Sequence, residues 1–268
     1  MDTLKKEAAH IQPDYALITG ASGGIGYELV LLMASKGHNM LLVARSEDKL
    51  KQIADSLSKR HNIKVIYLAV DLAVEKERMK LVDYIRNNNL QINILVNNAG
   101  FGDAGFFADA DWQKNERMIQ LNITALTHLT REFLPDMIAR NKGRILNVAS
   151  IAGYLPGPLM SVYYATKSFV VSFSNALHSE LRGTGVTVTT LSPGPVETNF
   201  FTEAGAADAK VNKLMKPASA NSVAHYGYMR MMQGKRKAIQ GLNNKFMVFG
   251  LRFMPSFVTN SILKRLHR

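Results

Sequence analysis

The chain has 268 residues, of which 47% are hydrophobic and 20% are charged. That length can bury a full hydrophobic core, and the ordinary apolar content argues against intrinsic disorder. Because the sequence contains no cysteine, it excludes disulfides, thiolate catalysis and cysteine-ligated metal centres. The lack of cysteine also fits a reducing compartment, and we expect a cytoplasmic protein.

Positive charge is concentrated at the end of the chain. The formal net charge is +12, but residues Ala209 to Arg268 hold twelve basic residues and no Asp or Glu. The first 208 residues are therefore neutral overall, with 21 basic and 21 acidic residues. Such an asymmetry can mark binding to nucleic acid or to an anionic membrane surface.

Six short apolar runs recur at nearly constant spacing and predict buried strands. Each is rich in β-branched or large aliphatic residues and is bounded by Gly, Asn, Asp or Ser. Runs that are apolar throughout fit a parallel sheet covered on both faces. The runs are 15–18, 40–43, 65–68, 92–96, 144–148 and 186–191.

Helical patterns lie between these runs, at 26–36, 46–60, 75–88, 111–138 and 161–182. We expect Ser46 to cap the second helix, Pro135 to kink the fourth near its end, and Gly183 to stop the fifth. The alternation predicts an α/β fold, a Rossmann-like doubly wound parallel sheet with helices on both faces. We expect one domain over residues 1–240, followed by a basic helical extension over 241–268.

Polar or glycine-rich residues follow every predicted strand. In an open α/β sheet, ligands bind outside the carboxyl ends of the strands, so this regularity predicts one binding site along that edge. The residues are the segment Thr19 to Gly26, then Arg45, Asp71 with Leu72, Asn97 to Gly100, Ser150, and Pro193 with Gly194.

The glycine-rich segment after the first strand suits a pyrophosphate. Glycines allow a tight turn and a close approach of the backbone to the ligand, which also meets the N-terminus of the following helix. The spacing Gly20-x-x-x-Gly24-x-Gly26 departs from the general GxGxxG pattern, so a plain glycine-rich turn remains an alternative.

Arg45, at the end of the second predicted strand, indicates the form of the nucleotide. An arginine near this position accommodates the 2′-phosphate of NADP, whereas an acidic residue would bind the free ribose of NAD. The alternative is a solvated arginine beside a helix start, and Glu47 and Asp48 are close in the sequence. We expect NADP.

Tyr163 and Lys167 are four residues apart in a predicted helix and therefore share a face. Tyrosine has a pKa of about 10 in solution, and a neighbouring ammonium group would lower that pKa. Such a pair alone is a common surface contact. With Ser150 at a strand end before it, the pair becomes a candidate acid–base site.

Together these residues resemble the short-chain dehydrogenase/reductase family in its single-domain form. The matching positions run in the family's order from Tyr15 to about Thr198, while both flanks match only loosely. They are Thr19-Gly20, Gly24, Gly26, Asp71, Asn97 to Gly100, Asn122, Ser150, Tyr163, Lys167, Pro193-Gly194 and Thr198.

The resemblance implies a catalytic role for four residues. Tyr163 would donate a proton to the carbonyl oxygen during reduction, and Ser150 would hydrogen-bond that oxygen. Lys167 would bind the nicotinamide ribose and lower the pKa of the tyrosine. Asn122 would hold a water for proton relay, with a helix-surface amide as the alternative.

The resemblance also implies an NADP-binding surface, in which Asp71 would contact the adenine and Asn98 would brace the central strands. The expected cofactor-binding residues are Gly20, Ser22, Gly24, Ile25, Gly26, Arg45, Asp71, Leu72, Asn98, Ala99, Gly100, Tyr163, Lys167, Pro193, Gly194, Val196 and Thr198. No metal site is expected, because the seven histidines lack metal-ligand spacing.

The expected function is an NADP(H)-dependent oxidoreductase that reversibly reduces a ketone or aldehyde of a largely apolar substrate. Apolar segments around Phe101 to Phe107, Gly153 to Met160, and Phe200 with Phe201 should wall the pocket, unless they merely pack under loops. A 3-oxoacyl thioester, a hydroxysteroid-like ketone and a xenobiotic carbonyl all remain open. A non-catalytic NADP-binding sensor or scaffold is the alternative, although it would not need an acid–base tyrosine.

The basic end leaves several partners open. Phe246, Phe249 and Phe253 recur at helical spacing, and an amphipathic basic helix of this kind can lie in a membrane interface. A dimerisation arm, or packing on the chain's own sheet, fits as well. Nucleic-acid binding is disfavoured because no DNA- or RNA-binding motif accompanies the charge. By analogy with the family, the helices at 111–135 and 161–182 would pair in a homodimer or homotetramer.

Overall fold

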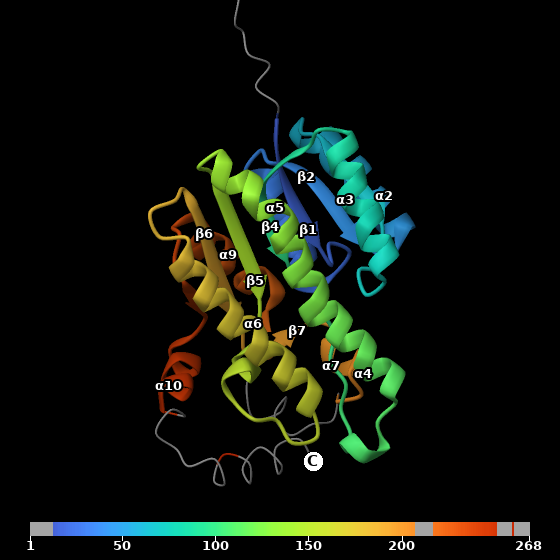
Figure 1. Ribbon diagram of the computed structural model, residues 1–268. Helices are drawn as coiled ribbons and strands as arrows, with labels where there is room; N and C mark the ends of the chain where they lie inside the picture. Colours follow the sequence, from blue (N-terminus) through green and yellow to red (C-terminus); the bar gives the residue numbers. More distant parts are fainter. Residues whose placement is uncertain (1–12, 207–216, 251–258, 260–268) are drawn as a thin grey trace, which may run out of the picture.

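The computed structural model describes residues 13–206, 217–250 and 259. Its centre is a seven-stranded parallel sheet with the order β3-β2-β1-β4-β5-β6-β9 (Figure 1). The strand order reverses between β1 and β4, which creates a switch point at the carboxyl ends of these strands. The strands are β1 (Asp14–Thr19), β2 (Asn39–Ala44), β3 (Val65–Ala69), β4 (Gln91–Asn97), β5 (Gly143–Val148), β6 (Val186–Ser192) and β9 (Lys237–Ile239).

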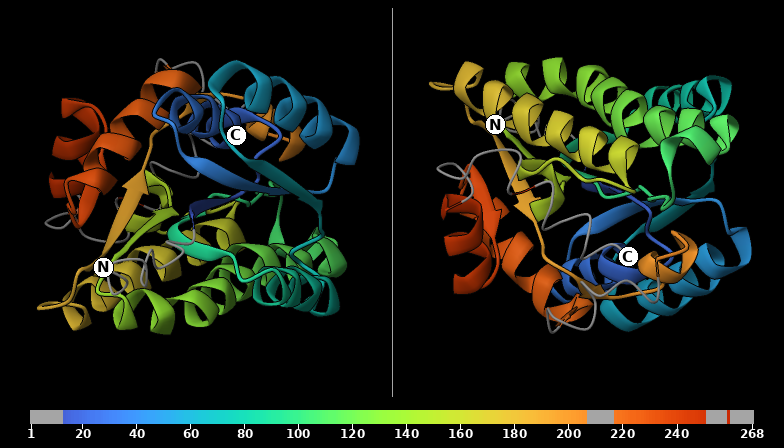
Figure 2. Two further views of the ribbon diagram at one scale, coloured as in Figure 1. Left: turned by 90° about the horizontal axis from the view of Figure 1, so that it is seen from above. Right: turned by 90° about the horizontal axis from the view of Figure 1, so that it is seen from below.

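Helices cover both faces of the sheet, as Figure 2 shows. One face packs against α1 (Gly24–Ser35), α2 (Glu47–His61) and α9 (Ala220–Met232). The other packs against α3 (Glu75–Asn87), α5 (Leu126–Ala139) and α6 (Ser161–Glu180), and α4 (Trp112–Ile119) precedes α5. The predicted doubly wound α/β fold is therefore confirmed.

Two separate cores explain why the strands carry apolar residues on both faces. Leu17 of β1 lies in the core beneath α3 and α5, and its neighbour Ile18 lies in the core beneath α1 and α2. Leu41 and Leu42 of β2 are divided between the two cores in the same way. Because successive side chains of a strand point to opposite faces, a sheet covered on both sides buries consecutive residues, most of which are apolar, with buried polar exceptions such as Asn147 of β5.

The strand predictions were wrong in two respects. The run at 65–68 forms β3, but β3 is an edge strand and its residues are only partly buried. The opposite edge, β9, was missed because this strand has only three residues, of which the first is Lys237, and therefore carries too little apolar pattern. A small second sheet of β7 (Val196–Glu197) and β8 (Ala218–Ser219) was missed for the same reason.

The predicted helix at 111–138 consists of three consecutive parts. Between α4 and α5 lies a π-helical segment, η2 (Gln120–Ala125), and Pro135 lies inside α5, which continues to Ala139. Single π turns inside α-helices often occur at functional sites. Asn122, one of the expected catalytic residues, lies in this segment.

The predicted helix ends differ in detail from those in the structure. Ser46 occupies the position before α2, but its side chain makes no capping hydrogen bond, and Glu47 and Asp48 provide negative charge in the first turn instead. α6 ends at Glu180, and Gly183 follows with a φ of +87°.

The remaining short elements lie near the carboxyl ends of the strands. They are η1 (Phe107–Asp109), η3 (Ile151–Tyr154), α7 (Phe200–Glu203) and α10 (Leu242–Gly250). α10 is the described part of the predicted extension, and the rest, except Thr259, lies outside the described residues, as does Phe253. In the described part of the chain, no helix is both long and apolar enough to cross a bilayer. The division of the chain at residue 240 stays a prediction.

Candidate active site

The glycine-rich loop after β1 has the close backbone packing that a dinucleotide site needs. Gly20 has a φ of +64°, and a Cβ there would lie 2.7 Å from the side-chain nitrogen of Asn98. A Cβ at Gly26 would overlap the carbonyl oxygen of Gly20. The start of α1 is therefore pressed against the loop, which also holds Ser22 and Ile25.

The N-terminus of α1 differs from that of α2. α1 has no acidic residue in its first turn and no side-chain capping bond, whereas α2 begins with Glu47 and Asp48. The partial positive charge of the first peptide N–H groups of α1 is therefore left without a neighbouring carboxylate. This arrangement fits the pyrophosphate of a dinucleotide.

Thr19 and Asn98 connect the glycine loop to β4. The Thr19 hydroxyl donates to the Val96 carbonyl at 3.1 Å and accepts from the N–H groups of Asn98 and Ala99 at 3.0 Å each. The Asn98 amide donates to the carbonyls of Thr19 at 3.0 Å and Gly20 at 3.2 Å. Asn98 thus lies where we expected a brace between the central strands. Ala99 and Gly100 follow at the same edge.

Arg45 and Asp71 lie at the ends of β2 and β3, on the side expected to hold the adenosine. Arg45 is exposed, and Asp71 forms an ion pair of 2.7 Å with Arg117 of α4. Burial opposes ionisation of Asp71, but hydrogen bonds from Arg117 and the Ala73 N–H, with the charges of Arg117 and Arg45, lower its pKa overall. Sequence reasoning missed Arg117, and no spacing signal marks it. Leu72, also expected here, has its side chain buried in the core.

The expected catalytic residues come together at the end of β5. Tyr163 and Lys167 project from α6 and are both buried, and Tyr163 is hydrogen-bonded to Ser150. The ammonium nitrogen of Lys167 donates to the Val148 carbonyl at 2.9 Å and lies 5.8 Å from the centre of the Tyr163 ring. Ser150 is oriented by the Ala152 N–H, which donates to its hydroxyl oxygen at 3.1 Å.

Burial controls the pKa values of this group. It raises the pKa of Tyr163 to about 12, although the hydrogen bond with Ser150 acts to lower it. Burial also lowers the pKa of Lys167 to about 8. Loss of solvation thus outweighs the effect of Ser150, and the lowering of the tyrosine pKa by Lys167 beside an oxidised nicotinamide stays a prediction. The phenol is held in its protonated, proton-donating form.

Asn122 is buried, not the surface amide of the alternative interpretation. Its side-chain nitrogen donates to the Phe101 carbonyl at 3.0 Å and to the Thr166 hydroxyl at 3.1 Å. Its side-chain oxygen accepts from the Phe101 N–H at 3.2 Å. A Cβ at Gly100 would lie 2.9 Å from this oxygen and 3.5 Å from the Lys167 nitrogen, so Asn122 lies close to Lys167.

The segment after β6 runs from the catalytic end back to the glycine loop. The Pro193 carbonyl accepts from the Ile151 N–H at 2.9 Å, and a Cβ at Gly194 would lie 2.9 Å from the side chain of Asn244 in α10. Val196 is buried in β7. A Cβ at Gly24 would lie 3.1 Å from the methyl group of Thr198.

Apolar residues enclose the Tyr163 ring. The Phe200 ring of α7 lies 5.2 Å from it between ring centres, and a Cβ at Gly102 would lie within 3.4 Å of Phe200, Tyr163 and Met160. The Ala104 N–H donates to the Ala204 carbonyl at 2.9 Å, so the loop after β4 is joined to the α7 segment. Phe101 and Phe201 belong to the same cluster.

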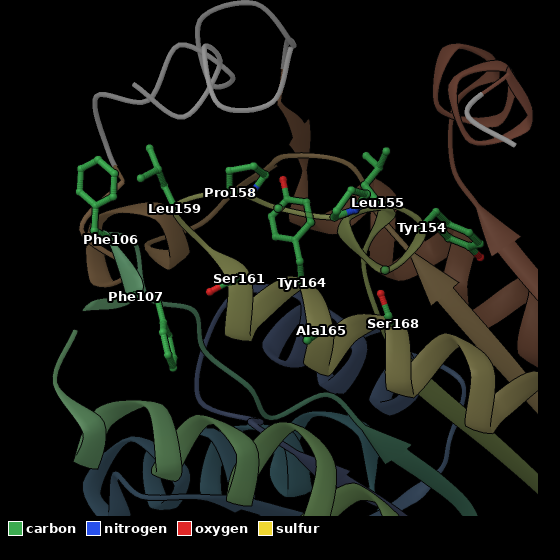
Figure 3. A pocket seen from close by; sticks show the side chains of 13 residues that line it. Phe106, Phe107, Tyr154, Leu155, Pro158, Leu159, Ser161, Tyr164, Ala165 and Ser168 are labelled. Atoms are coloured by element: carbon green, nitrogen blue, oxygen red, sulfur yellow. The ribbon is translucent and has the colours of Figure 1, made fainter. Parts of the chain in front are cut away.

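The residues that were expected to wall a single pocket lie in two places. Phe106, Phe107 and the segment Gly153 to Pro156 line a separate groove beside Tyr164, on another side of α6 (Figure 3). The sequence does not indicate which of these residues face the groove and which face Tyr163, because alternate residues of one loop face different sides.

The comparison with family models agrees with this geometry. A model described as short chain dehydrogenase matches residues 14–209. The chain belongs to the short-chain dehydrogenase family. It is therefore an oxidoreductase by family, and the resemblance noted from its motifs is confirmed.

Similar dehydrogenases include a named 3-oxoacyl-CoA reductase and several solved structures. The very-long-chain 3-oxoacyl-CoA reductase of Rattus norvegicus is 33% identical over 216 residues, which cover 78% of this chain and 66% of that protein. The chain thus spans slightly less than two thirds of that relative's length. A short-chain dehydrogenase from Sphingobium yanoikuyae in complex with NADPH is 30% identical, with a TM-score of 0.80 and coverage of 90% of this chain and 94% of that one.

Both forms of the nicotinamide cofactor occur among similar dehydrogenase structures. A family member from Burkholderia phymatum in complex with NAD is 25% identical, with a TM-score of 0.78 and coverage of 89% of this chain and 92% of that one. Within residues 13–206, 217–250 and 259, no group of three or more His, Asp or Glu side chains is placed to hold a metal ion.

Proposed function

We propose that this dehydrogenase reduces a ketone or aldehyde of a largely apolar substrate to the alcohol, with NADPH as cofactor and Tyr163 as the proton donor. The observation that carries the proposal is the convergence of Tyr163, Ser150 and Lys167 at the edge where the strand order reverses. A sensor or scaffold without turnover would not need this buried, hydrogen-bonded phenol.

The chemistry follows from what the residues can donate. Ser150 and Tyr163 can both hydrogen-bond a carbonyl oxygen, and their donors stabilise the negative charge that develops on it. NADPH supplies the hydride when bound. Tyr163 then transfers its proton to the oxygen, and the Lys167 ammonium favours the phenolate that remains. Asn122, buried beside Lys167, would position a water for reprotonation.

Arg45 supports the choice of NADP. Its guanidinium is exposed at the end of β2 and can pair with a 2′-phosphate through two parallel N–H donors. We expect Arg45→Ala to raise the KM for NADPH about tenfold or more and to leave the KM for NADH nearly unchanged, because only the phosphate contact is lost. Equal effects on both cofactors would contradict this assignment.

For the substrate, we propose a 3-oxoacyl thioester ahead of a hydroxysteroid-like or xenobiotic ketone. The support is the apolar enclosure of Tyr163, together with the named activity of the similar rat reductase. The test is a panel of these three ketone classes, followed by the loss of reduced-nicotinamide absorbance with NADPH and with NADH. A complete absence of turnover over the panel would favour the sensor alternative.

Assembly is proposed from the exposed residues of the two long helices. Ile138 of α5 and Phe169 of α6 are both more than a third exposed, which suits pairing of these helices between two copies. We propose a homodimer or homotetramer. Light scattering on the purified protein tests it, and a monomer at all concentrations would contradict it.

A peripheral membrane contact, with the protein otherwise in the cytoplasm, is proposed through the basic end. Leu242, Phe246 and Phe249 of α10 are each more than 60% exposed and share one side of the helix. Aromatic side chains beside basic residues favour an anionic lipid surface. We expect full-length protein to sediment with anionic liposomes at low salt and protein lacking Gly241 to Arg268 to remain in solution. Full-length protein that never sediments would refute the contact.

A further inference from the structure

A large groove lies on the side of α6 that carries Tyr164. It has a volume of about 1110 Å³ and lies between the loop after β5, the start of α6 and the Phe106–Phe107 turn (Figure 3). The described residues that line it are mostly apolar or aromatic, and none of them carries a charge. A groove of this size is large enough for a substantial ligand.

The groove adjoins the reactive tyrosine. The ring of Tyr164 lines it, and that ring meets the Tyr163 ring edge to face, with 6.0 Å between ring centres. In the loop before α6, Leu159 lines the groove, while the next residue, Met160, packs near Tyr163 and Gly102. The groove and the catalytic group therefore share a wall, which the two tyrosine rings and the Leu159–Met160 pair form.

The wall of the groove contains a strained residue. Leu159 has a φ of +68°, a region that a side chain with a Cβ enters at a cost of roughly 1–2 kcal/mol. Its carbonyl accepts a hydrogen bond of 2.8 Å from the Gly105 N–H, which joins this wall to the turn that carries Phe106. Strain held in place by tertiary contacts occurs preferentially at ligand-binding sites.

The loop also fits closely over Tyr164. A Cβ at Gly157 would overlap the Tyr164 ring, so the backbone rests directly on the ring face. Pro156 and Pro158 flank this glycine and restrict the backbone on either side. Figure 3 shows Tyr164 rising from α6 toward Pro158. The wall of the groove between Pro156 and Pro158 is thus held close against Tyr164 by the backbone.

We propose that this groove binds the hydrocarbon chain of a substrate whose keto group is reduced at Tyr163. The inference rests on the proposed function and extends it, because it assigns the substrate's chain to the Tyr164 side of α6. The described lining residues are largely apolar and match an alkyl chain, and none of them carries a charge that could pair with a charged head group. The enzyme would therefore prefer long-chain over short-chain 3-oxoacyl thioesters.

The experiment compares two chain lengths in a variant that fills the groove. Ala165 is exposed on α6 and lines the groove, whereas Ala176 is exposed on the same helix but is not a lining residue. We expect Ala165→Trp to lower kcat/KM for a 3-oxododecanoyl thioester about tenfold or more and to change that for a 3-oxobutanoyl thioester less than about twofold. The matched control Ala176→Trp, which lies on the same exposed face of α6 and would share any effect on helix pairing, should leave the ratio of the two kcat/KM values within about twofold of the wild type.

A binding measurement keeps the inference separate from the proposed activity. A fluorescent dodecanoyl probe should bind the wild-type protein and lose at least about tenfold affinity in Ala165→Trp, whether or not any ketone is turned over. If no ketone is reduced by the wild-type protein but Ala165→Trp still weakens binding of the probe, the proposed reduction is refuted and the groove proposal is retained.

Two outcomes would overturn the groove proposal. One is a folded Ala165→Trp that still prefers the long chain and binds the probe as the wild type does. The other is an equal loss for both chain lengths. If Ala165→Trp does not fold by circular dichroism, Ser168→Phe, which fills the same groove from the next turn, replaces it under the same criteria.

Discussion

Tyr163 and Tyr164 are adjacent in the sequence but face different surroundings, because consecutive residues of a helix point about 100° apart. On the Tyr163 side lie Lys167 and Ser150, with a buried hydrogen-bond network around them. On the Tyr164 side lies a groove in which none of the described lining residues is charged. The contrast teaches that α6 presents its acid–base residues on one side and part of the wall of the groove on another.

Burial alone does not distinguish the two tyrosines. It raises the pKa of both, to about 12 for Tyr163 and further for Tyr164. What distinguishes Tyr163 is the Ser150 hydroxyl bonded to it and the ammonium of Lys167 near its ring. A buried phenol becomes an acid–base candidate through such partners, which stabilise the phenolate formed during turnover.

The largest expected effect is the difference between the two hydroxyl deletions. Tyr163→Phe should lower kcat by a factor on the order of 10³, because the general acid is lost, and should leave NADPH affinity nearly unchanged. Tyr164→Phe should change kcat for a short-chain substrate less than about threefold. Steady-state kinetics and cofactor titration check both. Similar losses in the two variants would remove the distinction between the two sides.

An intermediate effect is expected from two glycines of the loop after β5. A Cβ at Gly153 would lie 2.6 Å from the Lys167 carbonyl oxygen and 2.8 Å from Val171, whereas at Gly157 it would meet the Tyr164 ring. We expect Gly153→Ala to lower the free energy of unfolding by about 1–3 kcal/mol and to reduce kcat for every substrate.

Gly157→Ala should instead reduce kcat/KM chiefly for long chains, since it displaces the wall of the groove. Gly250→Ala, where a Cβ meets no atom within 4 Å, is the control for both glycine variants and should behave as the wild type does in urea unfolding and in kinetics. Indistinguishable substrate profiles for the two loop variants would argue that the loop acts as one unit.

The smallest effect concerns the pH dependence of stability. Burial lowers the pKa of Lys167 to about 8 from 10.5 in the unfolded chain, so between these values the unfolded state binds more protons. The free energy of unfolding should therefore rise from pH 8 to 10, by about 1–2 kcal/mol relative to Lys167→Met. Urea unfolding at both pH values measures this, and parallel curves for the two proteins would exclude it.

Local sequence patterns determined much of this protein. The apolar runs mark the six longer strands because most side chains of a doubly covered sheet are buried against one of its two helical layers. The polar residues that end those strands mark the site, because parallel strands all end at one edge. The helical spacing of Tyr163 and Lys167 likewise determines that both lie on one face of α6.

Tertiary structure decided what local patterns do not contain. The π-helical segment at Asn122, the pairing of β9 with β6, the Arg117–Asp71 ion pair and the separate groove at Tyr164 all depend on contacts between distant parts of the chain. The pKa of Tyr163 belongs to this group, since burial is set by Phe200 and Gly102 from other segments. The hydrophobic periodicity of a strand or helix is set by residues that are neighbours in the sequence. Burial, solvation and pocket shape arise only when separate elements pack together.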